Sequence, residues 1–525
     1  MRLPLTKTAY LRGRQCPLRL WYWGQGLGEG DPEPASQGPD MLHEAAAVEA
    51  LAAELFPGGE RITAAVGGAA DRREALERTR AALADPSARV LLRPHLGDAR
   101  RLAVVDMLVR DGDGWRVVEV QASAAVKASH VQGLAFQWDV AESQGLDVRG
   151  ADVVHLRGEA VRGSEALSAS ELLVAEDITA AVREALPQAR ASAQQLLDTL
   201  ALETAPAVRP GPHCKGPSGG KDSLRASPCR HLLGGGACGS RLPAAWAGRL
   251  PGLRRGPKLD AVEALASQEL ADLDLDACDW TPAQRATIIA ARTGRRFVEP
   301  AGLRRWLNAL SFPVAYVDFE FDAGIAIPRF PGMRPYERLP FQWSMHVQSE
   351  PGGELVEHTP FLHLTPDDPR EAFLQSLLDA LPASGSLVAH SVAAEQGVLH
   401  QYTQATWFGG RHRQAVRRLS NRWADTLALT RPHYAHPDCR GSWSLKALAP
   451  AILGRAYEDL ELGDGMAAVR AWRRAVSEGA DPALRSALLA YCARDTELLH
   501  GIVEAMRAEV ANHSSGPQRP DRTTP

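Results

Sequence analysis

The sequence predicts an α/β protein, and its 525 residues are enough for more than one domain. Two patterns lead to this fold class. Residues 101–123 are typical of two strands joined by a tight turn at Asp111–Gly114, and a helical stretch around 127–143 follows. From about residue 311, three strand-like runs precede helices that alternate with strands. Both patterns indicate mixed sheets flanked by helices.

The composition narrows the class of protein. With 45% hydrophobic and 23% charged residues, the chain is globular rather than disordered or fibrous. The net charge of −4 gives no overall basic signal for nucleic acid, although a local basic groove is compatible with it. No apolar run reaches the length of a membrane span or of a signal peptide, so we expect a cytoplasmic protein without a membrane partner.

A change in composition marks the expected domain boundary. Residues 204–258 are rich in Gly, Pro, Arg and Cys. We predict an N-terminal domain over residues 1–240, a linker and helical connector over 241–310, a C-terminal domain over 311–510 and a disordered tail over 511–525.

The run "YVDFEFD" (316–322) carries three acids on one face of a predicted strand, because side chains alternate between the two faces. These acids are Asp318, Glu320 and Asp322, and we assign Asp322 to the surface or a loop. Two later helices also carry an acid on an apolar face. Asp495 lies in the stripe of the last helix, four residues after Tyr491, and Glu395 shares a face with Val398 and Leu399.

A buried carboxylate is costly unless it meets a cation or hydrogen-bond donors. If Asp318, Glu320, Glu395 and Asp495 converge, their repulsion therefore requires divalent cations, and oxygen ligands favour Mg²⁺ or Mn²⁺. Two such ions would activate water and stabilise the leaving oxygen in phosphodiester cleavage. Tyr491, one turn before Asp495, is a candidate for orienting the water.

The order Asp-x-Glu on a strand, an acid opening a later helix and a terminal Tyr-x-x-x-Asp resembles the DEDD exonucleases with a tyrosine in the last motif. These are DnaQ-like 3′–5′ exonucleases with an RNase H-like fold. The resemblance implies that Asp318, Glu320, Glu395 and Asp495 bind two metal ions and that Tyr491 acts in catalysis, while Asp425 in "DTLAL" is structural. The second motif departs from the usual Asn-x-x-Phe-Asp and reads "SVAAE".

The run "DFEFDAGIAIPRFPGMRPYERLPFQWSMH" resembles an uncharacterised bacterial family that couples such an exonuclease domain to an N-terminal nuclease-like region. In that region, Asp106 and Glu119 each end a candidate strand, which resembles the PD-(D/E)xK core of RecB-type nucleases and its restriction-endonuclease-like fold. Gln121 stands where this family has lysine, with Lys127 as a possible substitute, and Gln137 matches a helix glutamine of the RecB type. We expect this core to be degenerate, and a plain α/β domain with two surface acids is the alternative.

The seven cysteines are an odd number and do not predict a disulfide framework in an intracellular chain. Four of them resemble the iron–sulfur staple of some RecB-type nucleases: Cys16, Cys214, Cys229 and Cys238. Four thiolates suit a [4Fe–4S] cluster, and their wide spacing fits zinc less well. Unliganded thiols are the alternative.

The main functional hypothesis is a metal-dependent 3′–5′ exonuclease that acts on DNA or RNA. The alternatives are a catalytically decayed nucleic-acid-binding or scaffold protein, or an RNase H-like enzyme acting on a different phosphoester. The basic run "RHRQAVRRLSNR" (411–422) could follow a nucleic-acid backbone or form a solvated helix face. Two arginines have the same two interpretations, phosphate contact or a solvated loop: Arg329 and Arg334.

Overall fold

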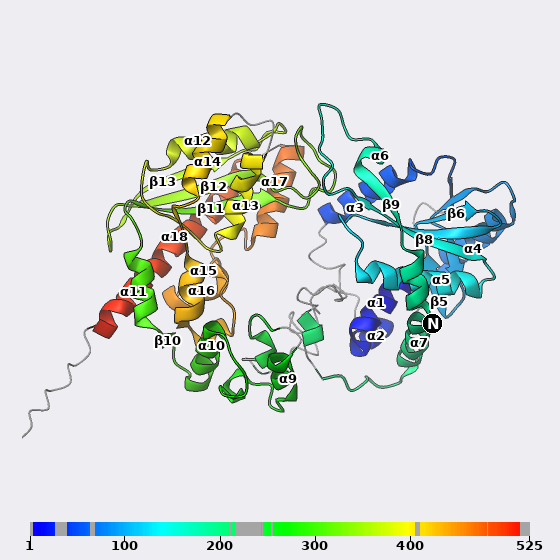
Figure 1. Ribbon diagram of the computed structural model, residues 1–525, viewed down its shortest axis with the longest axis horizontal. Coiled ribbons are helices and arrows are strands. Elements are labelled where there is room, and N and C mark those ends of the chain that lie inside the picture. The colour runs from blue at the N-terminus through cyan, green and yellow to red at the C-terminus, as the bar shows by residue number, and fades with distance from the viewer. Residues whose placement is uncertain are drawn as a thin grey trace, which may run out of the picture. The chain divides into compact units, whose positions relative to one another are not determined.

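The computed structural model describes residues 4–26, 39–62, 69–209, 212–215, 243, 245–253, 256–404, 410–479 and 481–514. The chain divides into two compact units (Figure 1). The first comprises Met1–Leu242 and Gly324–Tyr336, and the second comprises Pro243–Ala323 and Glu337–Pro525. Both units contain mixed sheets flanked by helices, which confirms the predicted α/β class.

The first unit is built around a six-stranded sheet with the order β2-β3-β6-β7-β8-β9. Its strands are β2 (Glu60–Arg61), β3 (Val90–Leu92), β6 (Met107–Asp111), β7 (Gly114–Gln121), β8 (Val148–Leu156) and β9 (Leu173–Asp177). The predicted hairpin is β6–β7, which pairs Asp111 with Gly114. A second sheet has the order β1-β5-β4 and consists of β1 (Leu5–Thr6), β4 (His95–Gly97) and β5 (Arg101–Val104). Asp106 therefore lies between β5 and β6 and not at the end of a strand.

Helices cover these sheets and close the first unit's core. They are α1 (Lys7–Gln15), α2 (Pro17–Gly24), α3 (Pro39–Ala53), α4 (Ala69–Ala84), α5 (Ala128–Ser143), α6 (Ala169–Leu172) and α7 (Thr179–Ala201). The core brings α1 against α5, where the rings of Tyr10 and Phe136 stack with centroids 4.9 Å apart. This packing fixes α1 beside β7, the strand that carries Glu119 and Gln121.

The second unit is organised by a five-stranded sheet with the order β13-β12-β11-β14-β15. The strands are β11 (Val314–Asp322), β12 (Leu339–Gln348), β13 (Leu355–Leu362), β14 (Leu387–Ala389) and β15 (Trp423–Asp425). Strand β12 runs antiparallel to both β11 and β13, and β14 and β15 are parallel to β11. The predicted succession of three strands followed by strands alternating with helices is therefore present.

The two faces of this sheet have different partners (Figure 1). On one face, Val317 and Phe319 enter an apolar core with α12 (Arg370–Ala380), α13 (Ala393–Gln404) and α14 (Gly410–Leu419). On the other face lies the long helix α18 (Pro482–Ser514), which packs against β11 and β12. Three more helices complete this side of the unit: α15 (Thr426–His433), α16 (Leu445–Leu453) and α17 (Gly465–Glu478).

The predicted connector folds as part of the second unit. It contains α9 (Pro257–Ala264), α10 (Pro282–Thr293) and α11 (Pro300–Asn308), and α11 packs against α18. A short pair of strands, β10 (Phe297–Val298) and β16 (Tyr434–Ala435), joins this region to the segment after α15. At the other end, α18 extends to Ser514, past the predicted start of the tail, and residues 515–525 lie outside the described residues.

Residues 324–336, which connect β11 to β12, fold with the first unit and not with the C-terminal domain to which the sequence assigned them. The buried carboxylate of Glu44 accepts a hydrogen bond from the Ala326 N–H at 3.0 Å and pairs with Arg329 at 2.9 Å. The Tyr336 hydroxyl donates to the Ala122 carbonyl at 2.5 Å. The segment "GIAIPRFPGMRPY" is therefore an anchored loop, and Arg329 is paired with an acid instead of standing free for phosphate.

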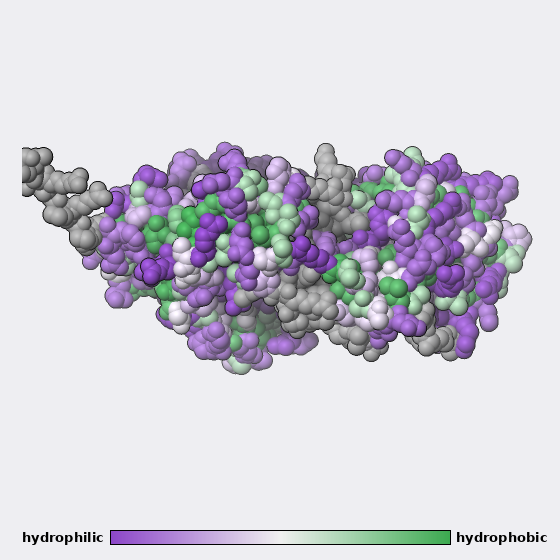
Figure 2. Space-filling view, turned by 90° about the horizontal axis from the view of Figure 1, so that it is seen from below, coloured by the Kyte–Doolittle hydropathy of each residue, from purple (hydrophilic) through white to green (hydrophobic). Residues whose placement is uncertain are grey.

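The surface in Figure 2 is mostly hydrophilic, with smaller apolar areas between. The exposed large hydrophobic side chains of the described residues are Val161, Leu202, Val356 and Met466. None of the helices in the described part of the chain is both long and apolar enough to cross a membrane.

Candidate metal centre

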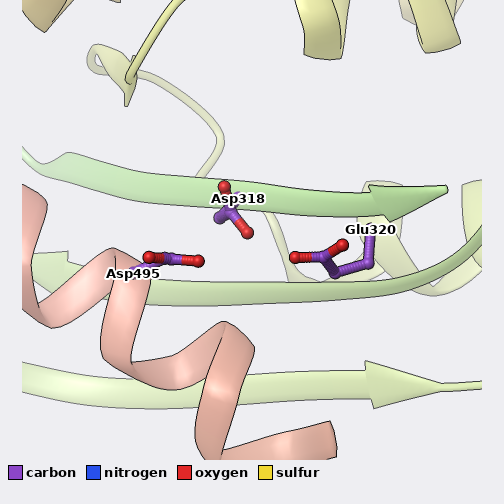
Figure 3. Close-up of side chains that lie close together, drawn as sticks. All are labelled: Asp318, Glu320 and Asp495. Carbon is purple, nitrogen blue, oxygen red and sulfur yellow. The ribbon is translucent and has the colours of Figure 1, made fainter. Parts of the chain in front are cut away.

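Three carboxylates of the second unit point toward one another (Figure 3). Asp318 and Glu320 come from one face of β11, and Asp495 comes from α18. One oxygen of each lies within 4.8 Å of the others. Glu320 and Asp495 are only 8% and 6% exposed, and Asp318 is partly exposed. Strand alternation and the helical stripe place each acid on the inner face of its element. The packing of α18 against β11 then brings the three acids together.

Hydrogen bonds fix the helix against the sheet beside these carboxylates. The Tyr457 hydroxyl donates to Asp495. Thr496, the next residue of α18, is hydrogen-bonded to Ser344 Oγ at 3.1 Å and to His346 Nδ1 at 2.7 Å. Ser344 is the β12 residue that pairs with Asp318 on β11. The position of Asp495 relative to Asp318 is therefore set by a buried polar network and not by apolar packing alone.

The carboxylates hold their protons unusually tightly. Burial, with repulsion from Asp495, raises the pKa of Asp318 to about 8. Burial also raises the pKa of Asp495 to about 6, although the Tyr457 hydrogen bond and the Lys446 charge act in the opposite direction. The pKa of Glu320 lies well above its usual range because of burial and of repulsion from Asp318 and Asp495. Replacing these protons by a divalent cation would remove the repulsion.

Glu395 lies near this group but outside it. It is 3% exposed, and burial followed by repulsion from Asp318 raises its pKa well above the usual range. Its Oε2 is buried and has no hydrogen-bond partner among the residues that the structure describes. An unpaired buried oxygen of this kind is costly unless a further ligand satisfies it. The structure therefore brings together three of the four predicted metal ligands, with the fourth as a neighbour.

The segment before Glu395 is held by Asp425. Ser391 adopts a φ of 67° just before α13, and its N–H donates to Asp425 Oδ1 at 2.9 Å. The same oxygen accepts from the Leu427 N–H at 2.8 Å and caps α15. Asp425 thus has the structural position that the resemblance implies for it.

Two residues of this centre were missed in the sequence. Tyr457 follows α16 in a stretch without regular periodicity, and its ring lies 6.0 Å from that of Tyr491. The Lys446 Nζ lies 5.4 Å from the Tyr457 ring centroid and 5.6 Å from that of Tyr491. Lys446 lies in the run "SLKALAP" (444–450), whose spacing alone gives no reason to single it out.

The assignment of Asp322 needs correction. Asp322 is not a surface residue: it is 1% exposed and forms a bidentate ion pair with Arg473 of α17 at 2.6 and 2.9 Å. Its cost of burial is offset by that guanidinium. Beside the same strand, the buried Cys492 of α18 donates from Sγ to Asp318 Oδ2 at 3.5 Å.

The acidic residues predicted for the nuclease-like core of the first unit lie beside a lysine of the same unit. Glu119 is 3% exposed, and the Lys7 Nζ of α1 lies 3.2 Å from its Oε1. Gln121 Nε2 donates to the same oxygen at 2.5 Å. Burial acts to lower the pKa of Lys7, but Glu119 and Asp106 outweigh it and raise the pKa. The ammonium that pairs with Glu119 is therefore that of Lys7, on α1.

The other predicted residues of this core have structural partners. Asp106 Oδ2 accepts from the Val120 N–H at 2.8 Å. Gln137 is fully buried and donates to the Val104 carbonyl at 3.1 Å, which ties α5 to the end of β5.

Two of the four predicted cluster cysteines are described. Cys16 and Cys214 are both buried, and Gln15 Nε2 donates to the His213 carbonyl at 2.9 Å, so their segments are adjacent. Cys229 and Cys238 lie outside the described residues, and the iron–sulfur set stays a prediction. Within the described ranges, Asp318, Glu320 and Asp495 form the one group of three or more His, Cys, Asp or Glu ligands with this spacing.

A family model described as a domain of unknown function (DUF2779) matches residues 315–444. The matched range contains Asp318, Glu320 and Glu395 and ends before Asp495. No curated protein matches the chain, and no solved structure matches it. The match names no activity.

Proposed function

We propose that the second unit is a metal-dependent nuclease that removes nucleotides from the 3′ end of DNA or RNA by a two-metal mechanism. The observation that carries the proposal is the convergence of Asp318, Glu320 and Asp495. The mixed sheet and the order of the acids agree with the resemblance to DnaQ-like exonucleases.

The donor atoms suit hard divalent cations. All of them are carboxylate oxygens, and the unpartnered Oε2 of Glu395 adds one beside the group. Mg²⁺ and Mn²⁺ prefer such ligands. When bound, two ions would supply an activated water and neutralise charge on the leaving oxygen.

The chain's own residues would orient the reactants. Asp318, Glu320 and Asp495 would hold the ions, and Tyr457 would keep Asp495 in place. Burial raises the pKa of Tyr491, so its hydroxyl keeps its proton and can hydrogen-bond the attacking water. In the reaction, the water oxygen bonds to phosphorus, the bond to the 3′ oxygen of the preceding nucleotide breaks, and that oxygen takes up a proton.

The test is digestion of single-stranded DNA and RNA, labelled at the 5′ end, by the full chain with Mn²⁺. We expect stepwise shortening and release of nucleoside monophosphates. Asp318→Asn is expected to lower the rate by several orders of magnitude, whereas Asp379→Asn on the exposed side of α12 is the matched control. Activity that survives Asp318→Asn would rule out this centre.

A second candidate is a nucleic-acid-binding protein that no longer cuts. Two observations favour it: Glu395 lies outside the group of three, and Lys7 already neutralises part of the acidic core in the first unit. Calorimetry distinguishes the candidates, because this one predicts no Mn²⁺ binding that depends on Asp318.

A further inference from the structure

Among the cationic side chains near the candidate metal centre, Lys446 has N–H groups that are not used in hydrogen bonds to the described residues. Three cations lower the pKa of its acids: Lys446 acts on Glu320 and Asp495, Arg494 acts on Asp495, and Arg338 acts on Glu395.

Both arginines are committed to other partners. Arg494 forms a bidentate pair with Asp459, at 2.8 Å for each bond, and also donates to the Ala456 carbonyl. Arg338 donates to the Ala394 carbonyl at 2.9 Å and lies over the Phe321 ring at 5.1 Å.

Lys446 is exposed, and its Nζ donates to the Gly463 carbonyl at 2.5 Å. An ammonium has three N–H groups, and within the described part of the chain Gly463 is the one acceptor bonded to it. Two N–H groups are therefore available to a ligand.

The surroundings of Lys446 hold its charge at the centre. The ammonium lies over the rings of both Tyr457 and Tyr491, which attract it. The first residue of α17 also lies beside the centre, because a Cβ at Gly465 would be 3.6 Å from Glu320 Oε2. A lysine held by two rings and a carbonyl loses less freedom on binding an anion than a free surface lysine.

The charge balance of the centre favours binding of a phosphate group by Lys446. In the described residues, the ammonium of Lys446 forms no ion pair with Asp318, Glu320 or Asp495. Two divalent cations would neutralise these three carboxylates. A phosphodiester then brings one further negative charge to the same place. We propose that Lys446 is the phosphate-binding cation of this centre and contacts a non-bridging oxygen of the phosphodiester or of the released 5′-monophosphate. This inference rests on the proposed function and names a substrate contact for it.

The experiment measures binding of adenosine 5′-monophosphate to the full chain with Mn²⁺ by calorimetry. Lys446→Met is expected to weaken binding on the order of tenfold, the loss of one charge-assisted hydrogen bond, and to leave Mn²⁺ affinity within about threefold. Lys446→Arg is expected to retain most of the affinity. Lys258→Met on α9 is the matched control. Thermal unfolding establishes that each variant folds.

The outcomes separate this inference from the proposed function. Equal binding of the nucleotide by wild type and Lys446→Met, or no binding by wild type, overturns the inference. If the wild type digests oligonucleotides while Lys446→Met keeps its KM and salt dependence, the inference fails and the exonuclease stands. If the wild type cuts nothing but binds the monophosphate through Lys446, the phosphate site stands and the exonuclease fails. The supporting result in kinetics is a higher KM, with a salt slope lower by about 0.7.

Discussion

The metal centre predicts an unusual dependence of stability on pH when divalent cations are removed. The perturbation is EDTA, followed by a pH titration of the free energy of unfolding. Burial and repulsion from Asp495 raise the folded-state pKa of Asp318 from 3.8 to about 8. The folded chain therefore binds more protons than the unfolded chain between these values, and its stability falls as pH rises. The contribution is fully present below about pH 4 and lost above about pH 8.

Other titrating groups restrict the pH range in which the loss of stability can be assigned to the raised carboxylates. Burial lowers the folded-state pKa of His130 and His346 to about 4, so their contribution rises with pH and is complete above about 6.5. Hydrogen bonds lower the pKa of Asp177 and Asp459 to about 2, and their contribution is constant above about pH 5. Between pH 6.5 and 8, the slope therefore comes from the carboxyl groups whose pKa is raised by burial, which are Asp318 together with Glu320 and Glu395.

The expected loss in this window is about 2 kcal/mol, since each pH unit is worth about 1.36 kcal/mol for one proton. Scanning calorimetry of the full chain measures it, and the transition that changes in Asp318→Asn identifies the second unit. Asp318→Asn is expected to reduce the slope, with Glu320 and Glu395 supplying the remainder, and to be more stable than wild type at pH 8. Saturating Mn²⁺ is expected to reverse the slope in wild type because it binds the deprotonated carboxylates. A flat profile in EDTA, or an equal slope in Asp318→Asn, would refute the reasoning.

Three further predictions test single contacts. Tyr457→Phe removes the donor to Asp495, and calorimetry is expected to show Mn²⁺ affinity lower by about tenfold; unchanged affinity would mean that the hydroxyl does not position the ligand. Lys7→Met leaves Glu119 buried without a cation and is expected to destabilise the first unit by about 3–5 kcal/mol in chemical unfolding. Adding Glu119→Gln should recover most of that loss, and no recovery would contradict the ion pair. Cys16→Ser is expected to lower the iron and sulfide content of anaerobically purified protein; equal content, or none in wild type, would argue against the cluster.

Local patterns in the sequence predicted most of the fold class and three of the candidate metal ligands. The alternation on β11 places Asp318 and Glu320 on the face opposite the apolar core, and the stripe of α18 places Asp495 inward. Both patterns arise within a few residues, where the periods of strand and helix decide which side chains are buried. The tight turn of β6–β7 was predictable for the same reason.

The errors came from partners far apart in the chain. Asp322 looked like a surface acid because nothing near it shows that Arg473 pairs with it. The loop after β11 could not be assigned to the first unit, since Glu44 binds it mainly through backbone N–H groups. Lys7 was missed because its place beside Glu119 depends on the packing of α1 against α5.

The two acidic clusters of this chain differ in how their charge is balanced, and the difference bears on function. In the first unit, Lys7 lies 3.2 Å from Glu119, so that core is stable without an external cation. In the second unit, no lysine or arginine of the described residues forms an ion pair with Asp318, Glu320 or Asp495, and Lys446, whose charge lowers the pKa of Asp495, is bonded to a carbonyl. Three carboxylates kept this close reduce stability at neutral pH unless cations join them. The second cluster is therefore the one that we propose as a metal site, and the first is expected to retain its fold when divalent cations are removed.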